Sequence, residues 1–243
     1  MDYISYSFGH INSNKISSLI TTKSWGSINP FTSYATIKRL SVGLELPEDQ
    51  ISSVIVFPEE VHGIMIHRCQ QEDGGSIRLL VDGLATSTSG LMLCLYTADC
   101  IPILFACDTP LAYGALHAGQ RGLLGGAIDN MISELAALDA PISAIKVGIG
   151  PCIHSCCYEI RDDLAQQATA NRMEEFIIRS AQRMTLDLPG IARHRLAQAG
   201  ILDVNVEAMP FCTACHTDQF FSGRNRSPDE ERGASFASLI WSK

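Results

Sequence analysis

The sequence predicts an α/β protein, and three observations support that class. The chain has 243 residues, 46% of them apolar and 18% charged, a composition typical of a globular protein with a sizeable core. Short apolar runs bounded by Ser, Gly, Asp and Pro fill its centre, as buried strands do. Segments of helical periodicity follow these runs. Because no stretch reads as a linker, we expect a single domain over residues 1–243.

The expected elements follow in chain order. Residues 11–36 are rich in Ser, Thr and Asn without a sustained period, and residues 37–47 carry a weak helical pattern. The expected strands are 77–86, 91–97, 101–107, 111–117, 144–150, 204–209 and 234–241. The expected helices are 123–135, 159–170 and 188–199.

Charge and hydropathy restrict the partners. A net charge of −8 and a pI near 5.3 argue against nucleic acid, which needs a concentrated field of Lys and Arg. The N-terminus lacks the apolar region of a secretory signal. The longest apolar stretch, residues 91–107, is interrupted by Asp99 and Pro102, so we expect no membrane span. Nine cysteines fit buried thiols or ligands in a reducing compartment, and we expect a cytoplasmic protein.

The stretch "CDTP" at 107–110 predicts a turn that joins two apolar strands into an antiparallel hairpin. If Ala106 pairs with Leu111, Cys100 lies directly across from His117, with β-carbons about 5 Å apart on one face. That separation suits two ligands of one metal ion, or a thiolate and its base. A slip of one residue would send the side chains to opposite faces. The alternative is that both are packed core residues.

His62, in "EEVHG", is the best candidate for a third ligand. Two histidines and one cysteine leave the fourth position of a tetrahedral zinc open, as in catalytic sites. A water held there has its pKa lowered to about 7 and becomes a nucleophile. Glu60 precedes this ligand closely enough to reach such a water, or it is a solvated surface acid.

Arg121 follows His117 among glycines that open a helix. Free N–H groups and a guanidinium there would bind phosphate or an electron-rich leaving group. The other interpretation of these glycines is close helix packing. The segment "GQRGLLGG" lacks the Lys-Ser/Thr end of a nucleotide-binding P-loop, which excludes ATP hydrolysis of that type.

A second group of candidate ligands lies toward the C-terminus. Its members are Cys152, Cys156, Cys157, Cys212, Cys215 and His216. The "CTAC" stretch has the spacing of a zinc knuckle or a redox pair. A second C-x-x-C is missing, which argues against a structural metal. We expect His10, His67 and His194 to face solvent.

Taken together, several stretches resemble the laccase-domain, YfiH-like family, first described as polyphenol oxidases and later as purine nucleoside phosphorylases with adenosine deaminase activity. They are "VHG" at 61–63, "DGLAT" at 82–86, "TADCIPILF" at 97–105, "HAGQRG" at 117–122, "GIGPCIHSCCYEI" at 148–160, and "CT" with "FFSGR" near the end. The likeness covers roughly residues 58–241 and leaves 1–57 divergent. It implies a compact mixed α/β sandwich in which His62, Cys100 and His117 hold zinc, or alternatively copper.

The resemblance also implies a pocket lined by Arg121, Asp99 and Cys157, with Arg224 as a further substrate-binding residue. The chain departs from the family pattern in the pocket wall. Glu60 stands where the family usually has Gln, Gln120 where it has Trp, and Ser222, Gly223, Arg224 and Asn225 stand for its "SYRR". The family's N-terminal "TRxGG" is blurred into residues 22–26. Substrate choice is therefore less fixed than metal binding.

The main expectation is a metal-dependent purine nucleoside phosphorylase for adenosine, inosine or methylthioadenosine. Phosphate near Arg121 would attack the ribose while the departing base is stabilised electrostatically. For deamination, Asp99 or Glu60 would move protons. Cys100 and His117 complete the expected catalytic set, and the protein would be a monomer or homodimer.

Three alternatives stay open. A copper-dependent polyphenol oxidase with a coupled multicopper site needs more histidines than the seven present. A thiol hydrolase would use Cys100 as nucleophile and His117 as base. An inactive nucleoside-binding paralogue is compatible with Gln120 and Gly223.

Overall fold

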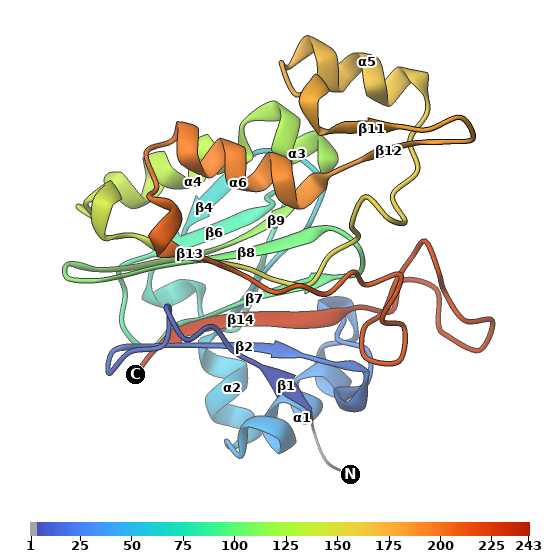
Figure 1. The fold of residues 1–243 in the computed structure, drawn as a ribbon. Coiled ribbons are helices and arrows are strands. Elements are labelled where there is room, and N and C mark those ends of the chain that lie inside the picture. Colours follow the sequence, from blue (N-terminus) through green and yellow to red (C-terminus); the bar gives the residue numbers. More distant parts are fainter. Residues whose placement is uncertain (1–3) are drawn as a thin grey trace.

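The computed structural model describes residues 4–243, except for the side chains of Thr32 and Ser33. Two six-stranded sheets lie face to face, and helices cover their outer faces (Figure 1). The strands are β1 Ser5–Tyr6, β2 Ile16–Thr21, β3 Ile55–Pro58, β4 Ile66–Arg68, β5 Ser76–Arg78, β6 Gly83–Thr86, β7 Met92–Thr97, β8 Ile101–Asp108, β9 Leu111–Ala118, β10 Lys146–Ile149, β11 Ile177–Arg179, β12 Met184–Leu186, β13 Val206–Ala208 and β14 Phe236–Ser242. The α-helices are α1 Ser33–Leu44, α2 Glu48–Val54, α3 Gln120–Gly125, α4 Ala127–Ala136, α5 Asp162–Ala170 and α6 Leu188–Gln198. Short 3-10 turns are Lys23–Trp25, Pro30–Thr32, Gln71–Asp73, Ile142–Ala144, Glu174–Phe176 and Asp203–Asn205.

Both large sheets are mixed. The first has the order β1-β2-β14-β7-β3-β5 and the second the order β13-β10-β8-β9-β6-β4, while β11 and β12 form a separate hairpin. This architecture confirms the predicted α/β class with a mixed-sheet sandwich. Over residues 4–243, no helix is both long and apolar enough to cross a membrane.

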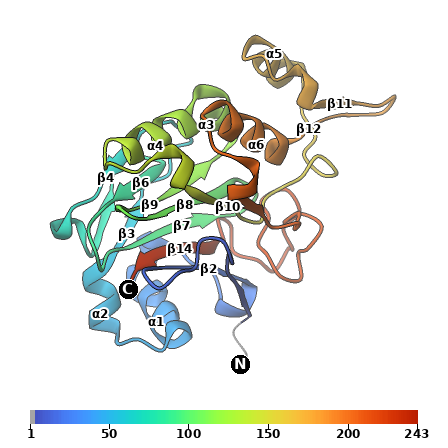
Figure 2. The ribbon, with the colours of Figure 1, turned by 60° about the vertical axis from the view of Figure 1, so that its left-hand side comes forward.

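The side-chain alternation of β8 shows how the layers are held together. Ile103 and Phe105 pack in the cluster that joins the second sheet to α3, α4 and α6. Leu104 and Ala106 point the other way, into the cluster between the two sheets. Because both faces of the strand are buried, its sequence is continuously apolar rather than alternating. Figure 2 shows these helices on one outer face of the sandwich and α1 and α2 on the other.

Helices α1 and α2 cover the outer face of the first sheet. The cluster beneath them includes Trp25, Leu40, Ile51 and Phe57. A β-carbon on Gly43 of α1 would lie 2.0 Å from the indole ring of Trp25, so only glycine lets this helix approach so closely. The weak helical pattern at 37–47 is therefore part of a real helix that starts at Ser33.

Two expected elements are divided in the structure. The run 77–86 contains β5 and β6, which belong to different sheets. Leu79 and Leu80 between them are 70% and 66% exposed. The prediction of one buried strand over 77–86 is therefore wrong. The helix expected over 123–135 is two helices, α3 and α4, separated at Gly126, whose φ is 95°. The sequence analysis did not identify the β11–β12 hairpin or the N-terminal strands β1 and β2.

The hairpin of β8 and β9 is present, but its predicted register is wrong. Asp108, not Ala106, pairs with Leu111, a shift of two residues. The strands extend further than "CDTP" suggested and leave a tight turn at Thr109–Pro110, whose peptide bond is cis. His117 consequently pairs with Pro102, and Cys100 lies just before β8. An even shift preserves the face on which a side chain points, so Cys100 and His117 still share one side.

Candidate functional site

Three side chains from distant parts of the chain meet at one end of the two sheets. His62 follows β3, Cys100 precedes β8 and His117 belongs to β9. Their ligand atoms all lie within 4.8 Å of one another. The two imidazole rings are nearly perpendicular, at 88°, with centroids 4.8 Å apart.

These three residues open into a cavity of about 260 Å³. The described residues that line it are Glu60, His62, Tyr96, Thr97, Ala98, Cys100, His117, Ser222, Gly223, Arg226, Glu230, Glu231, Gly233, Ala234 and Ser235. Its volume is close to the lower end of the range for small-molecule pockets, about 300 Å³. The cavity therefore suits a small ligand rather than a polymer.

Asp82, which is fully buried, orients two of the three residues. Its Oδ1 accepts hydrogen bonds from the His62 backbone N–H and the His117 Nδ1, both at 2.8 Å. Its Oδ2 accepts the Gly63 N–H at 2.6 Å. Burial alone would raise the pKa of Asp82, but these hydrogen bonds outweigh it and hold that pKa below its ordinary value. Because an ionised carboxylate only accepts, Nδ1 of His117 carries a proton, and Nε2 is the nitrogen left to face Glu60 and the cavity.

The backbone around the site is unusual. His62 has a φ of 60° and Asp99, next to Cys100, has a φ of 86°, both in the region that residues with a β-carbon rarely adopt. Such conformations gather at functional sites where the surroundings hold them. A β-carbon on Gly119 would lie 3.0 Å from Cδ2 of His62 and 3.2 Å from Sγ of Cys100. Glycine at that position therefore leaves room for the imidazole and the thiol.

The thiol of Cys100 lies among groups that stabilise its charged form. Burial works against the thiolate, but hydrogen bonds with His117 and His62 lower the pKa of Cys100 to about 6. The hydrogen bond with Cys100 raises the pKa of His62. Burial disfavours the charged form of His117, yet the opposing charge of Glu60 and its bond to Asp82 raise its pKa well above the ordinary value. The three side chains thus stabilise one another's charged forms.

Glu60 lies inside the site rather than at the surface. Its side chain is 7% exposed, and its Oε2 lies 3.8 Å from Nε2 of His117. The Tyr96 backbone N–H donates to Glu60 Oε1 at 3.1 Å, and the Glu60 N–H donates to the Tyr96 hydroxyl at 3.2 Å. Burial raises the pKa of this carboxyl to about 7, a value suited to a group that exchanges protons at neutral pH.

The donor set fits a zinc ion. Tetrahedral zinc with Zn–N near 2.0–2.1 Å and Zn–S near 2.3 Å keeps its ligand atoms roughly 3.3–3.6 Å apart, which small movements of atoms within 4.8 Å of one another can reach. The Asp82 carboxylate accepts from Nδ1 of His117, and a ligating histidine usually has such a partner on its other ring nitrogen. Three ligands leave a position that opens on the cavity.

The structure places Asp99 and Arg121 outside the cavity lining. The side chain of Asp99 accepts from the Thr213 hydroxyl at 2.6 Å and from the Arg224 backbone N–H at 2.8 Å, so it holds loops together. Arg121 is exposed, because the buried residues of α3, among them Leu123, turn the opposite face of the helix to the core. Neither residue is among those that line this cavity, and the pocket-lining roles that the resemblance implies for them stay predictions.

Cys157 and Arg224 are also absent from the described lining. Cys157 Sγ lies 3.4 Å from Cys215 Sγ, in a different cluster. The Arg224 guanidinium donates to the Glu159 carbonyl at 3.2 Å and lies over the Tyr158 ring, 5.3 Å from its centroid. Both side chains thus have partners outside the described lining, and their substrate-binding roles stay predictions.

Three residues of the site, Asp82, Arg226 and Glu230, were not predicted as functional. Asp82 stood only within the "DGLAT" stretch that carries the family resemblance. Arg226 and Glu230 come from the loop before β14; the Glu230 carboxylate forms an ion pair with Lys23, and Arg226 Nη1 donates to the Glu230 carbonyl at 2.6 Å. Ser222 and Gly223 occupy part of the wall where the family pattern differs. The sequence pointed to residues 222–225 of this loop only through the family resemblance, and no signal in it pointed to Arg226 or Glu230.

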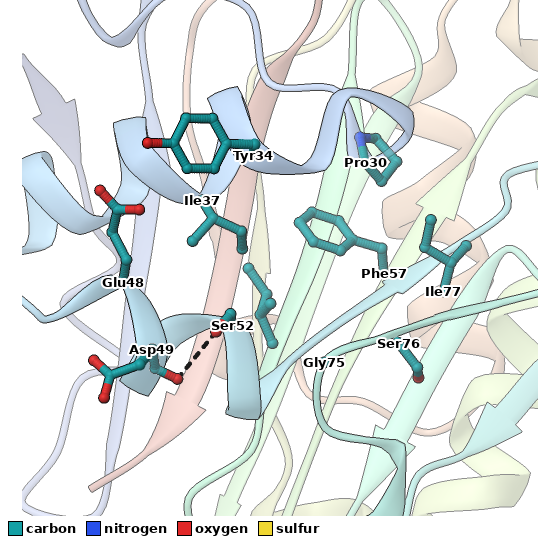
Figure 3. A pocket seen from close by; sticks show the side chains of 11 residues that line it. Pro30, Tyr34, Ile37, Glu48, Asp49, Ser52, Phe57, Gly75, Ser76 and Ile77 are labelled. Carbon is teal, nitrogen blue, oxygen red and sulfur yellow. Dashed lines mark hydrogen bonds between the residues drawn. The ribbon is translucent and has the colours of Figure 1, made fainter.

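Another pocket, of about 450 Å³, lies beneath α1 and α2. Figure 3 shows Tyr34 and Ile37 of α1 close to Phe57 of β3, with Glu48 and Asp49 of α2 at one side. Its lining contains no imidazole or thiol among the described residues. The cavity at His62 is therefore the better candidate for chemistry.

The chain is similar in sequence to known proteins. A family model described as multi-copper polyphenol oxidoreductase laccase matches residues 35–243. "Purine nucleoside phosphorylase YlmD" of Geobacillus stearothermophilus is 32% identical over 235 residues, 84% of this chain and 83% of that protein. "Purine nucleoside phosphorylase ORF3" of Streptomyces griseus is 30% identical and covers 71% of this chain and 70% of its own.

Solved structures show the same fold. The crystal structure of YlmD from Geobacillus stearothermophilus superposes with a TM-score of 0.82 at 27% identity, covering 94% of this chain and 92% of that one. The hypothetical protein YfiH of Bacillus licheniformis gives a TM-score of 0.83 at 24% identity, with 94% and 93% covered. The chain therefore belongs to the multi-copper polyphenol oxidoreductase laccase family, as its resemblance to YfiH-like, laccase-domain proteins predicted.

Proposed function

We propose that this protein is a zinc-dependent purine nucleoside phosphorylase whose centre is His62, Cys100 and His117. The observation that carries the proposal is the convergence of these three ligands within 4.8 Å on a cavity of small-molecule size. The relatives named purine nucleoside phosphorylase support the reaction class. When bound, the zinc would supply Lewis-acid stabilisation of developing negative charge.

The residues of the chain would divide the remaining work. Glu60, buried beside His117 and with a pKa near 7, would give a proton to the departing purine base. Arg226 lines the cavity, and the carboxylate of its neighbour Glu230 is paired with Lys23. The Arg226 guanidinium would therefore help to hold phosphate at the mouth of the cavity. Asp82 would keep the ligands in place rather than take part in bond breaking.

The test is an assay of the full chain loaded with zinc, with inosine or adenosine, in the presence and absence of phosphate. Phosphate-dependent release of free base and ribose 1-phosphate is the expected result. Release of ammonia from adenosine would reveal deaminase activity in addition. Zinc-loaded protein that releases no base in the presence of phosphate would contradict the proposal.

Two variants assign the roles. Cys100→Ser should lose both zinc and phosphorolysis, whereas Cys107→Ser, a change at a buried cysteine in β8 outside the cavity, should retain both. Glu60→Gln should keep zinc but lower kcat and remove the ionisation near pH 7 from the kcat profile. If Glu60→Gln has wild-type kcat at every pH, the proton-transfer role is wrong, and the metal site is unaffected by that result.

The lowered pKa of Cys100 favours a second candidate, a thiol hydrolase with His117 as the base. The two readings differ in what the thiol does. Iodoacetamide should label Cys100 in chelator-treated protein and not after zinc is restored if the thiol is a ligand. Equal labelling in both states, together with hydrolase activity in the chelated protein, would support the thiol nucleophile instead.

A further inference from the structure

We infer that Cys156, Cys157, Cys212 and Cys215 form a second metal site, a closed tetrathiolate site for structural zinc. The four residues lie outside the cavity described above, and the proposed reaction does not use them. Each offers a sulfur atom, and these atoms all lie within 4.8 Å of one another.

The topology explains why cysteines so far apart in the chain meet. Strands β10 and β13 are parallel neighbours, with Val147 paired to Val206, so the segments that leave them emerge side by side. Those segments stay in register through a bridge between Cys152 and Cys212. The turn after β10 then presents Cys156 and Cys157 to the "CTAC" turn that follows β13. An adjacent pair of cysteines takes the place of the missing second C-x-x-C.

The distances match a zinc–thiolate site. Cys215 Sγ lies 3.6 Å from Cys156 Sγ and 3.4 Å from Cys157 Sγ. Tetrahedral zinc with four Zn–S bonds near 2.3 Å separates its sulfur atoms by about 3.8 Å. A disulfide needs an S–S distance near 2.05 Å, and pairing two of the four thiols would leave the other two unexplained.

Burial raises the pKa of Cys156 and of Cys157, whereas hydrogen bonds outweigh burial at Cys212 and lower its pKa. The His154 backbone N–H donates to Cys212 Sγ at 3.4 Å, and hydrogen bonds of this kind favour the charged sulfur that metals require. His216 is not among the residues whose ligand atoms meet in this cluster, and its Nδ1 bonds the Cys212 carbonyl at 3.0 Å. With four sulfurs the coordination shell is complete, so the site is structural rather than catalytic.

The site would brace the wall of the catalytic cavity. Thr213, inside the "CTAC" turn, bonds Asp99 beside Cys100. The Asn225 side chain donates to the Ala214 carbonyl at 2.8 Å, which ties this turn to the loop carrying Ser222 of the cavity. A metal that clamps the two cysteine turns would thus fix both segments relative to the sheet.

The test is zinc analysis of the full chain purified under reducing conditions without added metal. Two zinc ions per chain are expected in the wild type, and one in either Cys215→Ser or Cys100→Ser. Cys107→Ser should keep both. After cobalt replacement, the thiolate-to-metal absorption characteristic of four sulfur ligands should disappear in Cys215→Ser and persist in Cys100→Ser. A zinc content in Cys215→Ser equal to that of the wild type would overturn the inference.

Alkylation of the wild type needs no variant to fold. Cys156 and Cys215 are exposed, so free thiols there would react readily with iodoacetamide. Protection of both until a chelator is added is the expected result, read by mass spectrometry. Equal labelling of Cys156 and Cys215 with and without chelator would overturn the inference. A disulfide between any two of the four cysteines in protein purified under reducing conditions without metal would also overturn it. Loss of zinc from His62, Cys100 and His117 alone would not change the labelling of Cys156 and Cys215.

Discussion

The change Asp82→Asn tests how the site is organised. The carboxylate accepts three hydrogen bonds, two at Oδ1 and one at Oδ2. An asparagine has one acceptor oxygen and one NH₂ donor, so whichever way it turns, one position places a donor against a donor. The least costly orientation keeps the bonds to His62 and His117 and loses the one to Gly63.

The magnitudes follow from that count. The Gly63 N–H is partly buried, and a donor left without an acceptor costs at most about 1–3 kcal/mol of unfolding free energy, which is a large share of a typical total of about 5–15 kcal/mol. Loss of the charge behind His117 weakens the histidine as a ligand. Removing the partner that orients a ligating histidine reduces metal affinity by about 10–100-fold, equivalent to about 1.4–2.7 kcal/mol.

Two measurements check these values. Urea unfolding of the metal-free protein gives the stability change, and competition with a chromogenic chelator gives zinc affinity. Asp203→Asn is the matched control, because that carboxylate is 84% exposed in a surface ion pair with Arg193, which contributes about 0–1 kcal/mol. If Asp82→Asn binds zinc as tightly as the wild type and unfolds at the same urea concentration, the orienting role of Asp82 is refuted.

Two further changes have defined outcomes. Gly119→Ala places a β-carbon 3.0 Å from His62 and 3.2 Å from Cys100. The variant should bind zinc more weakly in competition with a chelator, while its stability to urea barely changes. An unchanged zinc affinity would contradict the tight packing at Gly119. Asp73→Asn tests the pH dependence of stability. Burial raises the pKa of Asp73, but the hydrogen bond from the Gln70 N–H and the ion pair with Arg78 outweigh burial. They hold that pKa below its ordinary value. The carboxylate therefore stabilises the fold above its unfolded pKa of about 3.9 and loses that contribution as pH falls through the lower folded value. The variant should be about 1–3 kcal/mol less stable at neutral pH, and urea titrations should show the difference shrinking in acid; a constant difference would contradict this assignment.

Most of the central strands could be identified from the sequence alone. Strands β7 to β9 are buried on both faces, so their composition is nearly uniform and apolar, and short apolar runs are a local property of the chain. The same reasoning failed where exposure was decisive. Leu79 and Leu80 are apolar residues in solvent, and only the tertiary structure shows that they separate two sheets.

The candidate site, like the fold, could be predicted only in part from the sequence. The residue types His62, Cys100 and His117 suggested a metal, because imidazole and thiolate are local chemical facts about the chain. Their actual relation came from the β8–β9 register and from the unusual backbone at His62, neither of which residue spacing determines. The even shift in register preserved the shared face although the predicted pair was wrong.

The sequence by itself determined the class of fold and the set of soft ligands, because both follow from composition and periodicity along the chain. Only the tertiary structure decided which ligands meet. The parallel exit of β10 and β13 brings four cysteines together, and the fold directs Arg121 to solvent while placing Asp82 behind two ligands. Contacts between segments far apart in sequence depend on how the strands are ordered, and that order is a property of the packed molecule as a whole.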